Sequence, residues 1–146
     1  GNAMVDAIIP SNQSEIEKHE INRDSMNLID ENLKNNLHES YSIREMAGGG
    51  SLGNSMFGIT SFGGNGSFIG KIKNDEVGIF LQKDMVREGL QFPLGFTSPD
   101  ISTGCCTIFV EEDGTRTMCT FLGAGTLIGP DDINDQHIKN HKIAIL

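Results

Sequence analysis

The sequence has no long apolar run, few basic residues and little cysteine. No stretch approaches the roughly 18 apolar residues of a membrane-spanning helix, and no charged N-region precedes an apolar core as in a signal peptide. Lysine and arginine total 11 against 20 acids, and the net charge of -9 argues against binding to nucleic acids or anionic membranes. An acidic protein of the cytoplasm is expected, with neither nucleic acid nor membrane as a partner.

The cysteines and histidines show no metal-binding pattern. Neither CxxC nor Cys/His ligand spacing occurs, so reduced thiols packed as small hydrophobic groups are expected at Cys105, Cys106 and Cys119. His137 and His141 would share a helix face, but Ile138 stands where the HExxH zinc motif requires glutamate. His19 and His38 lie in polar contexts and are predicted to be on the surface. No metal site is expected.

Hydrophobic periodicity predicts an α/β chain of ordinary single-domain length. Polar residues 11–20 are expected to form a loop or an exposed ribbon, and helices are expected after Asp30, over 51–62, from Asp75 to Gly89 and from Pro130 onward. Strands are predicted at 3–9, 26–29, 41–46 and 67–72, in a hairpin of 103–110 with 115–122, and at the apolar end 142–146.

A glycine-rich turn follows the strand at 41–46. Gly48, Gly50 and Gly53 match the GxGxxG spacing of dinucleotide-binding folds. That interpretation is disfavoured because the preceding strand is too polar for a central Rossmann strand, and Asp75 begins a helix instead of ending a strand.

The same turn suits a ligand rich in hydroxyl groups. In Gly49-Gly50-Ser51-Leu52-Gly53-Asn54 the glycines allow close backbone approach, and Asn54 offers a donor and an acceptor; a tight turn with a solvated Asn54 is the alternative. Asp6, on the first strand, is suited to accept hydrogen bonds from two neighbouring hydroxyls of a ligand; the alternative is a turn residue. Arg116 either contacts a phosphate or is a solvated strand residue.

Taken in order, these features resemble the PfkB (ribokinase-like) kinase family. The matching stretches run from Gly1-Asn2 and Asp6 through Gly49-Gly50-Ser51 and Asn54 to Gly63-Gly64, Phe68-Ile69-Gly70-Lys71, Asp75 to Gly78, Gly89, Thr103-Gly104 and Asp113-Gly114-Thr115-Arg116-Thr117. The resemblance implies a ribokinase-like, Rossmann-type three-layer α/β sandwich with an inserted β-sheet lid. Residues 1–146 would be the N-terminal part of one kinase domain, with lid segments near 10–29, 40–46 and 103–122.

The resemblance also implies an activity. It is ATP-dependent phosphorylation of a primary hydroxyl of a nucleoside or sugar, with ATP and Mg²⁺ as cofactors; the Gly-Gly-Ser turn is most similar to adenosine kinases and their bacterial relatives. Arg116 would approach the transferred phosphate. The acceptor would be held by Asn2, Asp6, Gly49, Gly50, Ser51 and Asn54.

Two departures from the family pattern limit this implication. Gly53 stands where a larger residue is usual, and the second family signature, a DTxGAGD-type stretch with the catalytic aspartate and anion hole, is absent. The segment is therefore expected to hold the acceptor but to be inactive alone, because phosphoryl transfer needs a nucleotide site and a base. Alternatives are a ribokinase- or fructokinase-type sugar kinase, and a non-catalytic ligand-binding or dimerising module whose lid hairpin pairs with an edge strand of its partner, which in a homodimer is a second copy of the chain.

Overall fold

The computed structural model describes residues 1–93, 96–98 and 100–145. A five-stranded sheet runs through the molecule in the order β2-β9-β8-β1-β3, with β2 (Met26–Leu28), β9 (Arg116–Phe121), β8 (Gly104–Val110), β1 (Met4–Pro10) and β3 (Glu45–Gly49). The central pair, β1 and β8, is parallel, while β3 and β9 flank it in antiparallel orientation. This register sets Asp6 beside Cys106 on one side and Ala47 on the other.

Two short parallel pairs extend the sheet structure: β4 (Gly66–Ser67) with β6 (Leu90–Gln91), and β5 (Ile72–Lys73) with β7 (Phe96–Ser98). Helix α3 (Ser51–Ser61) leads from β3 into β4, and α4 (Glu76–Arg87) lies in the connection between the two strands of each pair. Strands joined through helices into parallel pairs make the chain α/β, as predicted.

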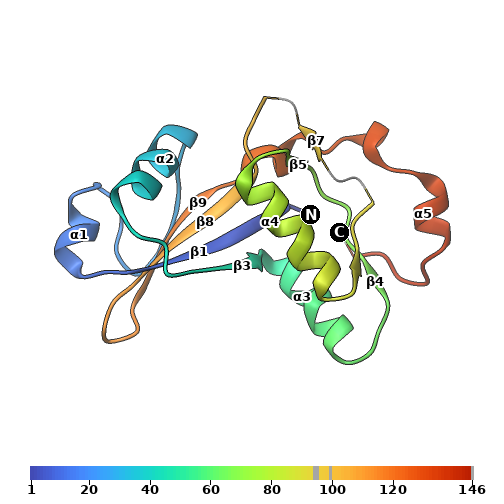
Figure 1. Cartoon of the computed structure of the whole chain (residues 1–146), viewed down its shortest axis with the longest axis horizontal. Helices are drawn as coiled ribbons and strands as arrows, with labels where there is room; N and C mark the ends of the chain where they lie inside the picture. Colours follow the sequence, from blue (N-terminus) through green and yellow to red (C-terminus); the bar gives the residue numbers. More distant parts are fainter. Residues whose placement is uncertain (94–95, 99, 146) are drawn as a thin grey trace.

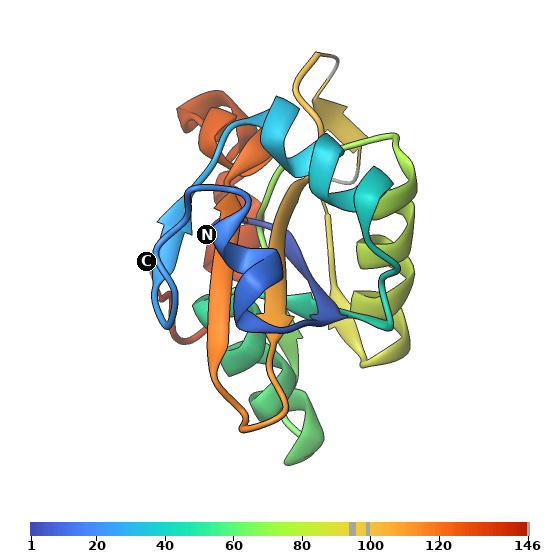
Figure 2. The ribbon, with the colours of Figure 1, turned by 90° about the vertical axis from the view of Figure 1, so that its left-hand side faces the viewer.

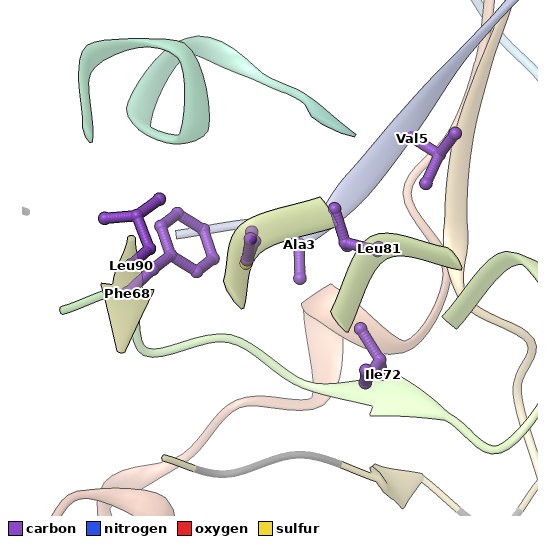
Figure 3. Close-up of a cluster of buried hydrophobic side chains, with 7 residues drawn as sticks. Ala3, Val5, Phe68, Ile72, Leu81 and Leu90 are labelled. Carbon is purple, nitrogen blue, oxygen red and sulfur yellow. The ribbon is translucent and has the colours of Figure 1, made fainter. Parts of the chain in front are cut away.

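Two separate hydrophobic cores lie at opposite ends of the long strands. Figure 1 shows α3 and α4 near one end of β1 and β8, and α1 (Gln13–Glu17) and α2 (Glu31–Ser40) beside the other end. The main core contains Ala3, Val5, Phe68, Ile72, Leu81, Met85 and Leu90, most of which Figure 3 labels. The distal core contains Ile9, Ile16, Leu37, Phe109 and Cys119, and in Figure 2 the blue and cyan helices that cover it face the viewer.

Local sequence signals explain where two of the predicted helices begin. The Asp75 side chain accepts a hydrogen bond from the Gly78 amide at the start of α4, and Gly89, with φ of +80°, follows its last turn. Asp30 caps α2 in the same way through the Leu33 amide.

Several sequence predictions were wrong in detail. Residues 11–20 contain α1, whose five residues are too few for a periodic pattern but are fixed by a capping box between Asn12 and Glu15. The strand predicted at 41–46 begins only at Glu45 and extends through the glycines, because those residues pair with β1. The strand predicted at 67–72 is divided between β4 and β5.

The end of the chain also differs from the prediction. After a 3₁₀-helix, η1 (Gly123–Leu127), the helix predicted from Pro130 is split into a 3₁₀-turn, η2 (Pro130–Asp132), and a short α5 (Asp135–Lys139). Residues 142–145 form no strand and are exposed, and Leu146 lies outside the described residues. An apolar run without a neighbouring strand has no partner for its backbone groups.

His19 and His38 are half-buried and not on the surface. The His19 Nε2 atom lies 2.9 Å from the Tyr41 hydroxyl, and the His38 Nε2 atom lies 2.9 Å from Thr107 Oγ1. Both rings pack toward the sheet from the distal end, a placement that the polar sequence around them does not reveal. Over the described part of the chain, no helix is long and apolar enough to cross a membrane.

Candidate functional site

Asp6 occupies the middle of the central strand β1 and is half-buried. Burial raises the pKa of its carboxyl group above the ordinary value, because a desolvated carboxylate is less stable than a solvated one. Within residues 1–93, 96–98 and 100–145, no protein group donates a hydrogen bond to this carboxylate. A half-buried carboxylate without a protein partner is available to a ligand.

The glycine turn lies directly against Asp6. A Cβ atom added to Gly49 would stand 2.3 Å from Asp6 Oδ1, so only glycine leaves room for the carboxylate. Gly50 has φ of +80° and ψ of 150°, precedes α3 as its N-cap, and accepts a hydrogen bond from the Asn54 amide at 2.9 Å. The Asp6 carboxylate and the glycine turn are therefore in direct contact.

The helix α4 fixes the position of this turn. The buried Asp84 carboxylate accepts a hydrogen bond of 2.8 Å from the Gly48 amide and pairs with Arg87. A Cβ atom on Gly48 would stand 2.7 Å from the Phe57 ring and 2.9 Å from Asp84. The turn is thus held by α3 on one side and α4 on the other.

The remaining predicted acceptor residues surround the same point. Asn2 is exposed just before β1, and a Cβ atom on Gly50 would lie 3.3 Å from the Asn2 carbonyl oxygen. Ser51 and Asn54 are exposed in the first turn of α3. The structure thus gathers Asn2, Asp6, Gly49 and Gly50 closely, with Ser51 and Asn54 following on the adjoining helix turn.

The sheet face that carries Asp6 continues onto β8, β9 and β2. In register with Asp6 lie Cys106, Thr120 and Leu28, and Thr120 donates a hydrogen bond of 3.4 Å to the Cys106 sulfur. Two residues along the strands, on the same face, Ile8, Ile108, Met118 and Met26 form a second, apolar row. Met26 and Leu28 are 55% and 66% exposed. Strand alternation alone suggests that these side chains share a face, but only the register places them in the same rows as Asp6 and Ile8.

Arg116 is not beside Asp6. It is the exposed first residue of β9 and pairs with Val110, whereas Thr120, in register with Asp6, lies four residues further along the strand, or about 13 Å away. Arg116 and Thr120 are an even number of residues apart, so their side chains lie on the same face of the sheet. A role at the transferred phosphate stays a prediction.

The cysteines are buried and unreactive. Burial raises the pKa of the Cys105 thiol to about 12 and also raises the pKa of Cys106, so neither is an activated nucleophile. No disulfide links the three thiols, as expected from their spacing. The described residues contain no group of three or more His, Cys, Asp or Glu side chains placed to hold a metal ion.

Comparison with known proteins identifies the family. The model of the pfkB family of carbohydrate kinases matches residues 20–145. Among solved structures, the adenosine kinase of Sinorhizobium meliloti is 35% identical with a TM-score of 0.84, over 94% of this chain and 42% of that one. A probable sugar kinase of Rhizobium etli CFN 42 is 32% identical with a TM-score of 0.81, over 92% and 41%.

Among curated relatives, probable fructokinase-4 of Arabidopsis thaliana is 29% identical over 104 residues, which span 66% of this chain and 30% of that protein. The chain thus covers less than half the length of these relatives. The structural likeness confirms the predicted ribokinase-like α/β fold. With the family model covering most of its residues, the chain belongs to the pfkB family of carbohydrate kinases.

Proposed function

We propose that this chain supplies the acceptor site of an ATP-dependent kinase that phosphorylates a primary hydroxyl of a nucleoside such as adenosine. The observation that carries the proposal is the Asp6 carboxylate, which is half-buried, receives no hydrogen bond from the described residues and faces the Gly49 backbone. An ionised carboxylate accepts two charge-assisted hydrogen bonds, which matches two neighbouring ribose hydroxyls.

The glycine turn supplies further contacts to the acceptor. Gly49 and Gly50 let the acceptor reach the backbone, and Asn54 in the first turn of α3 adds a donor and an acceptor. Asn2 and Ser51 border the same space. Such a site holds the acceptor and orients its reacting hydroxyl, which is the positional part of phosphoryl transfer.

Exposed apolar side chains further along the sheet face that carries Asp6 favour a nucleoside over a simple sugar. Met26 and Leu28 project from β2, and Met118 lies next to Met26 on the same sheet face. A planar base has an apolar face that such side chains cover, whereas a hexose carries hydroxyl groups there. The match to an adenosine kinase agrees with this choice, and the match to a probable fructokinase supports a sugar as the second candidate.

The residues described here do not fit the cofactors ATP and Mg²⁺. No acidic cluster suitable for a metal ion occurs among them, and the Lys71 ammonium pairs with Asp132 at 2.9 Å. Arg116 is a single exposed cation at the hairpin. We therefore assign nucleotide binding and the catalytic base to the part of the kinase fold that these residues do not form.

A binding panel on the full-length protein tests the proposal. Adenosine, fructose and ribose are titrated separately by calorimetry, and phosphorylation is followed with ATP and Mg²⁺. Adenosine is expected to bind most tightly and to be phosphorylated. Tighter binding and turnover of fructose would favour the sugar kinase, and binding without any turnover would favour a non-catalytic module.

A further inference from the structure

The inner face of α2 carries a buried lysine. Lys34 is only 7% exposed, and its ammonium group donates a hydrogen bond of 3.1 Å to the hydroxyl of Ser102, which is also buried. The same ammonium lies 5.4 Å from the centroid of the Phe121 ring, at the end of β9. The Lys34 side chain therefore connects α2 with two other segments: the start of β8, through Ser102, and the end of β9, through Phe121.

This lysine has no acidic partner. Among the residues that the structure describes, no carboxylate lies within ion-pair distance of the Lys34 ammonium. His38, one helix turn further along α2, is a second basic group on this side. Burying a charge without a counter-charge is unfavourable, and a hydrophobic side chain of similar size is often as stable or more stable at such a position. Stability alone therefore does not explain a lysine here.

The contacts beyond Ser102 lead to the acceptor site. The Ser102 carbonyl accepts a hydrogen bond of 2.8 Å from the Ala124 amide in η1. The next residue of η1, Gly125, approaches Asn2 so closely that an added Cβ atom would stand 3.0 Å from the Asn2 Cα atom. Thus a continuous set of contacts runs from Lys34 through Ser102 and η1 to the residue that precedes β1 and Asp6.

A second branch leads to the glycine turn. The amide of Thr103, which follows Ser102, donates to the Asp75 carboxylate at 2.9 Å, and Asp75 caps α4. Helix α4 in turn holds the Gly48 amide through Asp84. Ser102 and Thr103 thus take part in both sets of contacts, the one that reaches Asn2 and the one that reaches the glycine turn.

We propose that Lys34 is a positioning residue for the acceptor site, which it affects through Ser102 without touching the ligand. Since it concerns the same site, this inference rests on the proposed function. Lys34 lies under the face opposite to Asp6, because its contact residue Phe121 is in register with Cys105 and Val5, the neighbours of Cys106 and Asp6.

The test compares Lys34→Met, Lys34→Arg and Ser102→Ala in the full-length protein, with Lys83→Met as the control on an exposed lysine of α4. Adenosine binding is measured by calorimetry, thermal stability by calorimetric melting, and exchange of the Ala124 amide by hydrogen–deuterium exchange. For Lys34→Met we expect an unchanged or higher melting temperature, adenosine binding weaker by roughly fivefold to tenfold, and Ala124 exchange faster by about tenfold. Lys34→Arg should retain most of the affinity, and Lys83→Met should behave as the unmutated protein.

The outcomes separate the two proposals. Unchanged Ala124 exchange in both Lys34→Met and Ser102→Ala would overturn the positioning role, whatever ligand the protein binds. A loss of affinity that follows an equal loss of stability would make Lys34 merely structural and would overturn it as well. If the unmutated protein binds fructose and not adenosine, the nucleoside assignment fails, and the same comparison is read with fructose as the probe.

Discussion

At the scale of single residues, the proposed acceptor site depends on the Asp6 carboxylate and on Gly49, which leaves room for it. Replacing Asp6 with Asn retains the volume but leaves one acceptor oxygen and presents an NH₂ group to the second hydroxyl. We expect adenosine binding to weaken by about 2–4 kcal/mol while ATP binding changes little. Separate calorimetric titrations of the two ligands measure this, with Asp131→Asn, an exposed acid, as the control. Unaltered adenosine affinity would contradict a role for Asp6 in binding the acceptor.

The glycine beside this carboxylate gives the second prediction at this scale. In Gly49→Ala the new Cβ atom would start 2.3 Å from Asp6 Oδ1, so the strand or the carboxylate must shift. We expect a loss of about 1–3 kcal/mol in unfolding free energy together with weaker acceptor binding.

Gly58→Ala is the matched control for Gly49→Ala. Its Cβ atom would meet nothing within 4 Å in the interior of α3, so we expect it to stabilise the protein by about 0.5–1 kcal/mol. Urea unfolding of both variants decides the matter, and equal effects would contradict the close packing at Gly49.

At the scale of the elements, α4 is anchored by one side chain that serves two segments. The Asp75 carboxylate caps the helix through the Gly78 amide and also accepts hydrogen bonds from the amide and hydroxyl of Thr103. Asp75→Ala removes the cap and leaves the buried Thr103 amide without its acceptor, so we expect a loss of about 2–4 kcal/mol.

The comparison for Asp75→Ala is Asp30→Ala, which removes a single capping bond from α2. Its expected effect on unfolding free energy is about 1 kcal/mol. If chemical denaturation showed similar losses for the two variants, the link between α4 and the start of β8 would be unimportant for stability.

At the scale of the whole molecule, stability should fall in mild acid. Burial, and then the neighbouring Lys34 charge, lower the pKa of His38 below its ordinary value of 6.5, so the unfolded chain binds the proton more readily than the folded one. The contribution of His38 to the free energy of unfolding is fully present above pH 6.5, and it is lost as the pH falls from 6.5 through the lower pKa of the folded state. The unfolding free energy of the full-length protein at pH 8 and pH 5 shows the effect, and His38→Gln should flatten the difference. An equally steep decline in the variant would place its origin elsewhere.

The division of the active site gives a further prediction at this scale. Residues 1–146 alone should show no ATP-dependent phosphorylation of adenosine, fructose or ribose, because the site proposed for them would hold the acceptor without an anion hole or a base. A coupled ADP-release assay, run beside the full-length protein, measures it. Turnover by the isolated segment would show that the described residues also bind the nucleotide.

Local signals in the sequence determined several helix boundaries and the hairpin of this protein. Asp30, Asp75 and Gly89 mark helix boundaries because a cap acts within one helix turn, and the hairpin of β8 and β9 follows from alternation around Asp113-Gly114. The ordered motifs also predicted the family, because its turns recur as short stretches at fixed places in the chain.

Tertiary structure alone decided the features that depend on contacts between distant segments. The registers of β1 with β8, β8 with β9 and β9 with β2 set Thr120 and Leu28 in one row with Asp6, and leave Arg116 about 13 Å along β9 from that row. The burial of Lys34 and His38 depends on how α2 packs over the strands, and α1 is too short to show a period. Register and packing are set by side chains from many parts of the chain at once, so no local pattern contains them.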